Sequence, residues 1–258
     1  MMLKMDKLTI TEVKSILQQP KIKADILKHL AEDERQGVQR LLVSYQRRIE
    51  KQQKMQATFN ERQVFEQAYW KKGQFVAGID EVGRGPLAGP VVAAAVVLDD
   101  NFDLIEVHDS KQLSLKKREA LVPKIKSQAL DYAFGVVTSE QIDEINIYQA
   151  ARVAMSEAYK GLQYNVNGLL IDAMDLDIEL EQTSLIKGDD RSISIGAASI
   201  LAKDYRDNLM AEYDLKYPGY DFKNNAGYGT AKHLAGLEKL GITPIHRKTF
   251  SPVKNYLN

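Results

Sequence analysis

Apolar residues in the middle of the chain follow two kinds of pattern, short unbroken runs and longer stretches with helical spacing. The short runs are rich in small and β-branched residues and predict strands at 75–80, 91–98, 132–138 and 168–172. The stretches with helical spacing predict helices at 113–129, 147–162 and 192–213. Strands that cluster first and then alternate with helices predict an α/β domain whose sheet mixes antiparallel and parallel strands.

The first 70 residues carry helical signals only. Thr9 and Glu12 have the spacing of a capping box and predict the start of a short helix, which Pro20 interrupts. A longer apolar stripe follows, formed by Val38, Leu41, Leu42, Tyr45 and Ile49. Arg and Lys residues on the opposite face of that helix are either a solvated surface or an arm that contacts phosphates. We expect a helical, basic N-terminal extension over residues 1–72 and a main domain over 73–258.

Composition narrows the class of protein. The 258 residues, 44% of them hydrophobic, can bury a full core, and no stretch approaches the roughly 20 apolar residues that a membrane span needs. The N-terminus also lacks the apolar run of a secretory signal, so we expect a cytoplasmic protein without membrane contact. The net charge is zero, and the excess of 13 Lys and Arg over 9 Asp and Glu in residues 1–70 is too small to identify a polyanionic partner.

The absence of Cys excludes disulfides and thiolate metal sites, and the four His residues never have the spacing of an HExxH motif. Any bound metal is therefore expected to be a hard cation with oxygen ligands.

The segment 78–90 has the densest chemical pattern in the chain. Asp80 and Glu81 follow an apolar run and precede a glycine-rich turn at residues 83–90. Side chains of adjacent strand residues point to opposite faces, so these two carboxylates can share a ligand only where the strand bends or ends. They are either part of a joint metal site or exposed turn carboxylates. The turn is not a dinucleotide fingerprint, because its third glycine comes one place too late and a strand follows it. The chain has no P-loop motif either.

Two further acids follow at informative places. Asp172 ends the apolar run 168–172, and if that strand lies parallel to the strand at 75–80, Asp172 and Asp80 meet at one edge of the sheet. Asp189 is expected to open the helix at 192–213, where it is either a capping acid or part of the site. Four carboxylates without His or Cys suit Mg²⁺ or Mn²⁺.

A series of blocks in unbroken order resembles a known family. The blocks are GIDEVGRGPLAGPVVAAAVVL at 78–98, DSKQLS at 109–114, LLID at 169–172, KGD at 187–189, AASILAKDYRD at 197–207, AGYGT at 226–230 and PIHRKTF at 244–250. Together they resemble ribonuclease HII over about residues 74–253. The GRG at 83–85 is typical of type HII and differs from the GKG expected of type HIII.

The resemblance implies a ribonuclease H-like fold, with a mixed five-stranded sheet, flanking helices and a helical C-terminal portion. It implies that Asp80, Glu81, Asp172 and Asp189 bind Mg²⁺ or Mn²⁺ and catalyse phosphodiester hydrolysis that leaves a 5′-phosphate and a 3′-hydroxyl. Asp190 stands beside Asp189, and a one-residue slip would exchange them. The implied substrates are RNA/DNA hybrids and DNA duplexes containing ribonucleotides, cut on the 5′ side of the ribonucleotide.

The resemblance also implies which residues bind the substrate. Backbone groups of Gly83, Arg84 and Gly85 would approach the 2′-hydroxyl that distinguishes RNA from DNA. Tyr228 would pack on the sugar of the neighbouring deoxynucleotide, and Lys111 would bind a phosphate.

Three further predictions concern other residues in or next to these blocks. Ser110 is expected to assist Lys111. The cluster His246-Arg247-Lys248 either contacts the duplex backbone or is simple surface charge. The run 196–199 is assigned to close packing of a helix on the sheet.

Two other functions are alternatives to the nuclease, because they would use the same kind of acidic, nucleic-acid-binding surface. A non-catalytic module could bind RNA/DNA hybrids, but it gains nothing from four acids near a polyanion unless cations are present. A transposase-like strand-transfer enzyme would share acids and metals, but should lack the GRG turn and the tyrosine. We expect a monomeric nuclease.

Overall fold

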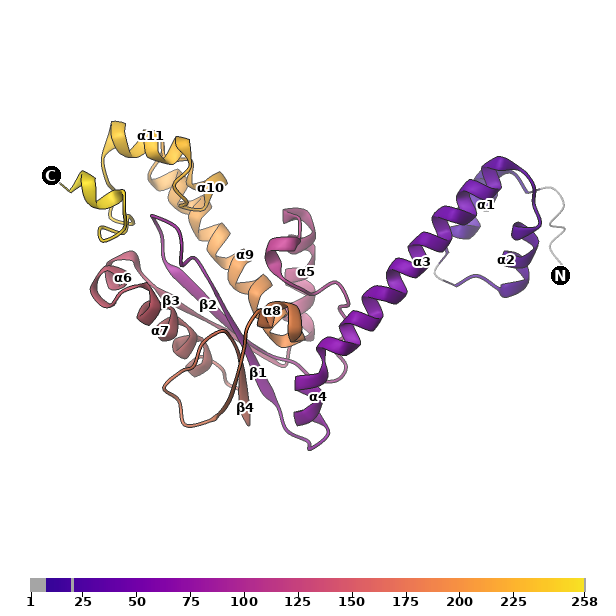
Figure 1. Ribbon diagram of the computed structural model, residues 1–258, viewed down its shortest axis with the longest axis horizontal. Helices are drawn as coiled ribbons and strands as arrows, with labels where there is room; N and C mark the ends of the chain where they lie inside the picture. Colours follow the sequence, from indigo (N-terminus) through magenta and orange to yellow (C-terminus); the bar gives the residue numbers. More distant parts are fainter. Residues whose placement is uncertain (1–7, 20, 258) are drawn as a thin grey trace. The chain divides into compact units, whose positions relative to one another are not determined.

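The computed structural model describes residues 8–19 and 21–257, and the chain divides into two compact units between Thr58 and Phe59. The first unit contains helices α1 (Ile10–Leu17), α2 (Ala24–Ala31) and most of α3 (Gln36–Arg62), drawn in indigo and violet in Figure 1. The predicted capping box is confirmed at the start of α1, whereas the predicted interruption at Pro20 lies outside the described residues. Buried apolar side chains hold these helices together, namely Val13, Leu17, Leu30, Val38 and Leu42.

The second unit contains the mixed five-stranded sheet that the resemblance implied. Its strands are β1 (Val76–Val82), β2 (Val91–Val97), β3 (Asp131–Val137), β4 (Gly168–Asp172) and β5 (Glu181–Leu185), in the spatial order β3-β2-β1-β4-β5. The first three pair antiparallel, whereas β4 lies parallel to both β1 and β5. The conditional expectation that the strands carrying Asp80 and Asp172 run side by side in parallel is therefore confirmed.

Helices cover both faces of the sheet (Figure 1). One face packs on α7 (Ile147–Lys160), whose buried residues are largely alanines. The other face packs on α9 (Ile193–Lys216) and α5 (Leu115–Gln128). The assignment of residues 196–199 to close helix packing holds only in part, because Ser199 also bonds to Ser110. No helix in the described part of the chain is long and apolar enough to cross a membrane.

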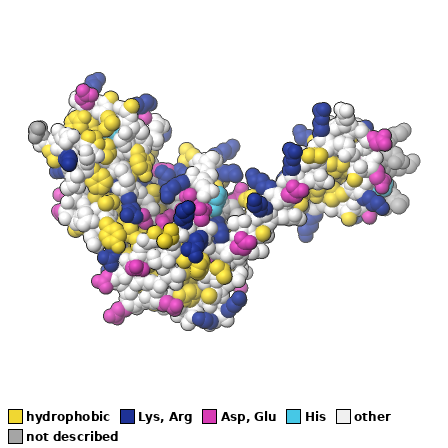
Figure 2. Space-filling view, in the orientation of Figure 1, with side chains coloured by type: hydrophobic (Ala, Val, Ile, Leu, Met, Phe, Trp, Pro, Cys, Tyr) yellow, Lys and Arg dark blue, Asp and Glu magenta, His cyan; other side chains and the backbone are white. Residues whose placement is uncertain are grey.

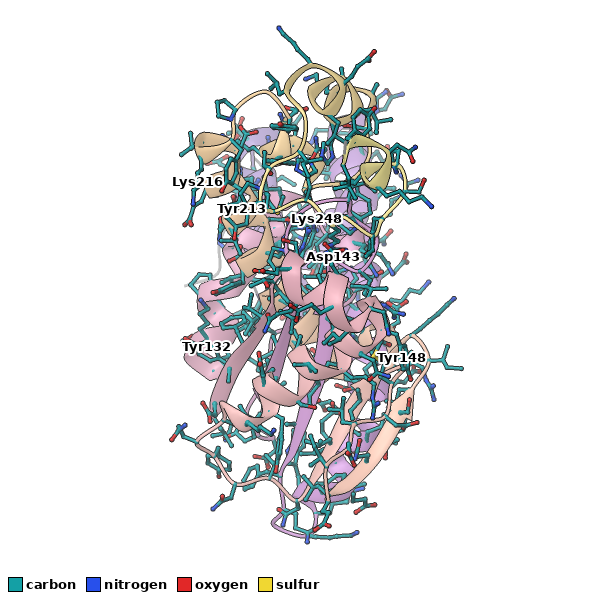
Figure 3. The ribbon with its side chains drawn as sticks, turned by 90° about the vertical axis from the view of Figure 1, so that its left-hand side faces the viewer. Tyr132, Asp143, Tyr148, Tyr213, Lys216 and Lys248 are labelled. Atoms are coloured by element: carbon teal, nitrogen blue, oxygen red, sulfur yellow. The ribbon has the colours of Figure 1, made fainter. Side chains whose placement is uncertain are left out.

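The C-terminal part forms its own small core around one end of the sheet. It consists of α10 (Phe222–Asn225), α11 (Ala231–Leu240) and a 3₁₀ turn at Val253–Tyr256. Apolar side chains from this part pack against Leu87 and Ala88, which come from the glycine-rich turn. The segment after Arg247 is also tied to α6 (Ser139–Ile145), because Asp143 accepts hydrogen bonds from the backbone N–H groups of Lys248 and Thr249. Figure 3 shows Asp143 and Lys248 next to each other.

Residues 59–70 are built into the second unit. Phe59, near the end of α3, lies in the core between the sheet and α9, and Tyr69 of α4 (Val64–Trp70) packs against Val76. The predicted division at residues 72 and 73 stays a prediction, but Phe59, Glu66 and Tyr69, which precede it, are buried in the main unit.

Candidate active site

Three of the four predicted acids lie at the carboxyl ends of two neighbouring strands. Asp80 and Glu81 belong to β1, and Asp172 is the last residue of β4. We expected β1 to end at its acids, and this is correct only on one side. Pairing with β4 stops at Ile79, whereas pairing with β2 continues through Val82. The acids are therefore held by a continuing strand at the point where its other neighbour ends.

The fourth acid reaches the site by a different route from the one expected. Asp189 does not open the long helix, because it lies in the short helix α8 (Gly188–Arg191), and the N-cap of α9 is Ser192. A hydrogen bond joins the start of α8 to one of the strand acids, since the backbone N–H of Gly188 donates to Oδ1 of Asp172 at 2.6 Å. Asp189 is buried, whereas Asp190 is exposed. The burial favours Asp189 over its neighbour as the residue that faces the other acids.

The electrostatics show that the carboxylates act on one another. Burial, and then repulsion by Glu81 and Asp172, raises the pKa of Asp80 well above its usual range. Burial raises the pKa of Glu81 to about 7, with Arg84 opposing the shift and Asp172 adding to it. Burial, followed by Asp109 and Asp172, raises the pKa of Asp189 to about 6. Such a cluster of buried like charges is unfavourable unless a cation is bound.

The donor atoms fit a hard divalent cation. Oε2 of Glu81 is buried and has no hydrogen-bond partner, so it is an acceptor without a proton donor. All the acids offer oxygen ligands, which Mg²⁺ and Mn²⁺ prefer. Among the described residues, no three of these groups converge tightly enough to hold an ion as they stand, and like charges at close range repel one another. Figure 2 shows Asp and Glu side chains next to Lys and Arg side chains on the surface of the second unit.

The glycine-rich turn and Tyr228 lie against each other. Gly83 has a φ of +97°, and a side chain there would run into the guanidinium of Arg206. A Cβ on Gly85 would come within 3.3 Å of Cε1 of Tyr228, so the ring stands directly over this exposed glycine. Tyr228 itself is 49% exposed. The structure thus brings the two predicted sugar-contacting elements together.

Two buried arginines hold this turn through backbone carbonyls. Arg206 donates to the carbonyls of Ala88, Pro90 and Ala226, and Arg247 to those of Gly83, Arg84 and Gly89. Burial lowers the pKa of Arg206 to about 10 and that of Arg247 to about 9. Both pKa values leave the side chains charged at neutral pH.

The predicted cluster His246-Arg247-Lys248 needs correction. His246 and Arg247 are 1% and 0% exposed, so neither is a surface charge nor a contact to the duplex, and only Lys248 is exposed. The sequence gives no sign of this burial, because an arginine satisfied by carbonyl oxygens needs no acidic partner.

Lys111 and Ser110 take different positions in the site. Lys111 is exposed. Burial works to lower its pKa, but the nearby acids, led by Asp80 and Asp109, together raise it. Ser110 is buried, and its hydroxyl lies 3.0 Å from that of Ser199. Ser199 in turn acts on Asp80, because its hydroxyl opposes the rise in the pKa of that acid. No sequence pattern indicated a chemical role for Ser199, which lies between Ser110 and an acid of the site.

Arg62 and Glu66 are two further residues that the sequence did not indicate. Arg62 is buried and donates to the carbonyls of Asp189 and Ser192. Glu66 is buried as well and accepts from the hydroxyls of Ser192 and Ser194. The end of α3 and the start of α4 therefore support the junction between α8 and α9, where Asp189 lies.

Comparison with known proteins places this geometry in a family. The family model described as Ribonuclease HII matches residues 77–253, and that of the Ribonuclease HII N-terminal domain matches residues 9–70. The ribonuclease HII of Lactobacillus johnsonii is 53% identical over 249 residues, which cover 96% of this chain and 99% of that protein. That of Lactobacillus delbrueckii subsp. bulgaricus is 55% identical over 244 residues, or 95% of each chain.

Among solved structures, the ribonuclease H2 from Pyrococcus horikoshii has a TM-score of 0.59 and 28% identity, covering 70% of this chain and 96% of that one. The ribonuclease H-like fold is thereby confirmed. With both regions of the sequence matched, this chain belongs to the ribonuclease HII family.

Proposed function

We propose that this enzyme, an endonuclease of the ribonuclease H type that acts on RNA/DNA hybrids, also cuts duplex DNA on the 5′ side of embedded ribonucleotides. The products would be a 5′-phosphate and a 3′-hydroxyl. The observation that carries the proposal is the cluster of buried carboxylates at the ends of β1 and β4, which lies close to a turn and a tyrosine suited to reading sugars.

Asp80, Glu81, Asp172 and Asp189 would hold two divalent ions, Mg²⁺ or Mn²⁺. Bound there, such ions supply a nucleophilic water and neutralise the charge that develops on the leaving 3′-oxygen. The chain itself contributes the orientation of the acids. The backbone N–H of Glu81 donates to Oδ1 of Asp80, and that of Gly188 donates to Oδ1 of Asp172, so each of these carboxylates is oriented through one of its atoms.

The glycine-rich turn would recognise the ribose through its peptide N–H groups. The carbonyls of Gly83 and Arg84 both point to the buried Arg247. In a trans peptide the C=O and the N–H of one unit point in opposite directions, so the N–H groups of Arg84 and Gly85 point away from the interior. These N–H groups can donate to a 2′-hydroxyl, which a deoxyribose lacks.

Tyr228 would contact the sugar of the neighbouring deoxynucleotide, because its exposed ring stands beside Gly85. Together the turn and the ring would favour an RNA-to-DNA junction over a uniform RNA strand. Lys111, exposed near the acids, would bind a phosphate. Ser110 would assist indirectly through Ser199, since its buried hydroxyl is bonded there.

Two alternatives are less suitable. A non-catalytic hybrid-binding module and a strand-transfer enzyme are both set aside by membership of a nuclease family, together with the GRG turn and the tyrosine. The monomeric state and the cytoplasmic location stay predictions.

Cleavage of a labelled DNA duplex with one ribonucleotide, with Mg²⁺ or Mn²⁺, tests the proposal. We expect cutting 5′ of the ribonucleotide, and a loss of more than about a hundredfold in Asp80→Asn. The matched control Asp100→Asn changes an exposed acid and should leave the rate unchanged. A native enzyme that cuts RNA/DNA hybrids but never this duplex would refute the junction activity. Full activity of Asp80→Asn would refute the site.

A further inference from the structure

Two buried histidines lie directly beneath the turn that carries Tyr228. His233 belongs to the first turn of α11, and His246 to the segment that follows this helix. They are 0% and 1% exposed, and their Nε2 atoms lie 3.0 Å apart. The rings of Tyr220 and Phe222 pack against both. The function proposed above gives neither histidine a role.

The hydrogen bonds allow only one arrangement of protons in the neutral pair. The backbone N–H of Thr243 donates to Nδ1 of His246 at 2.8 Å, so this nitrogen carries no proton. Neutral His246 then carries its proton on Nε2 and donates it to Nε2 of His233. His233 must carry its own proton on Nδ1, from which it donates to the carbonyl of Tyr228 at 3.0 Å.

Burial favours the neutral form of both histidines. Burial, and then the neighbouring His233, lowers the pKa of His246 to about 4. Burial also lowers the pKa of His233. The chain of hydrogen bonds therefore runs in one direction, from the N–H of Thr243 through both rings to the carbonyl of Tyr228.

The two ends of this chain belong to the two elements that would read the substrate. His246 forms an isolated antiparallel β-bridge with Ala88 of the glycine-rich turn. The residues on either side of His246 also form hydrogen bonds with this turn. Of these, Ile245 accepts from the N–H of Gly89, and Arg247 holds the carbonyls of Gly83 and Arg84. His233 holds the backbone of Tyr228. The bond between the histidines therefore links the support of the turn to the support of the tyrosine.

We propose that His233 and His246 form a positioning relay that holds Tyr228 against the glycine-rich turn and so sets the preference for RNA–DNA junctions. The proposal rests on the sugar-reading role given above to Tyr228 and the turn. Neither histidine touches substrate, so both are positioning residues. Burial of two polar rings is unfavourable unless each ring nitrogen forms a hydrogen bond. Here the last hydrogen bond of the series goes to Tyr228, the residue that would touch the sugar.

The protonation pattern can be measured without any substrate. In long-range ¹H–¹⁵N spectra of the full-length protein at pH 7, we expect His233 with its proton on Nδ1 and His246 with its proton on Nε2. The chain has only four histidines, so the signals can be assigned with single variants. The opposite tautomer in either ring, or an imidazolium, would overturn the relay.

The functional test compares two substitutions of His233. Asn can place an amide N–H where Nδ1–H now donates, whereas Leu removes the donor. We expect His233→Leu to reduce the ratio of kcat/KM for a single-ribonucleotide duplex over an all-RNA strand in a hybrid by about three- to tenfold. His233→Asn should retain most of this ratio. Equal loss in both variants would contradict the positioning role, and circular dichroism checks that each is folded.

A double-mutant cycle with Tyr228→Ala separates the relay from the proposed function. If the relay acts through the tyrosine, His233→Leu should not reduce the substrate ratio further when Tyr228 is already Ala. A further loss of similar size in that background would overturn the relay. If Tyr228→Ala by itself leaves the ratio unchanged, the sugar-reading role of Tyr228 is wrong. A normal effect of Tyr228→Ala with no effect of His233→Leu refutes the relay alone.

Discussion

Replacement of Glu81 by Gln should stabilise the metal-free protein at alkaline pH. Burial raises the pKa of Glu81 from 4.5 to about 7 in the folded state. Because the folded state binds this proton more tightly than the unfolded state, the free energy of unfolding falls as pH rises from about 4.5 through 7 and then levels off. At about 1.4 kcal/mol per pH unit, the full shift corresponds to about 3 kcal/mol. The amide carries no charge and avoids this cost.

The assay is urea unfolding followed by circular dichroism in EDTA between pH 4 and 8.5. We expect Glu81→Gln to match the native protein near pH 4 and to be about 2–3 kcal/mol more stable at pH 8.5. Glu238→Gln, which changes an exposed glutamate on α11, is the matched control. Saturating Mg²⁺ should stabilise the native protein more than the variant, because binding to the folded state offsets the repulsion. A constant difference across the pH range would refute the reasoning.

Two other changes test how residues before the sheet support the site. Arg62→Met removes donors to the carbonyls of Asp189 and Ser192. It should lower the free energy of unfolding by about 2–4 kcal/mol and weaken Mn²⁺ binding by calorimetry about tenfold or more; an unchanged Mn²⁺ affinity would show that this support does not reach the metal. A chain that begins at Phe59 should unfold cooperatively on heating, whereas one that begins at Gln74 should not, since it lacks buried residues of the second unit. The chain from Phe59 should also bind duplex DNA more weakly with a smaller salt dependence, and equal binding would remove the phosphate-contacting role of the first unit.

The sequence predicted strands and helices correctly where their apolar pattern is strong, and missed elements where that pattern is weak. The strands at 76–82, 91–97 and 168–172 were predicted within about two residues, because their central residues are buried on both faces and form unbroken apolar runs. β5 was missed, since Glu181–Leu185 is a polar edge strand whose position depends on pairing with β4. The helix α11 was missed as well, although Thr230 caps it.

The sequence indicated the carboxylates of the candidate site through strand-end positions and the family resemblance, and the site they form stays a prediction. The preference for Asp189 over Asp190 comes from burial in the structure. The sequence by itself determined the turn residues, since a turn between two strands with φ of +97° at Gly83 needs glycine. Tyr228 was indicated by its flanking glycines and the family resemblance, and the structure places it beside Gly85.

Only the tertiary structure decided what holds these residues in place. Arg62 and the carbonyl of Asp189 are 127 positions apart in sequence and meet only after folding. Arg247 and His246 resembled surface charge in the sequence, yet both are buried beneath the elements that would read the substrate. The physical reason is that these side chains bond mainly to backbone groups. Every residue offers a carbonyl and nearly every one an N–H, so no pattern of side chains along the chain can indicate such a partner.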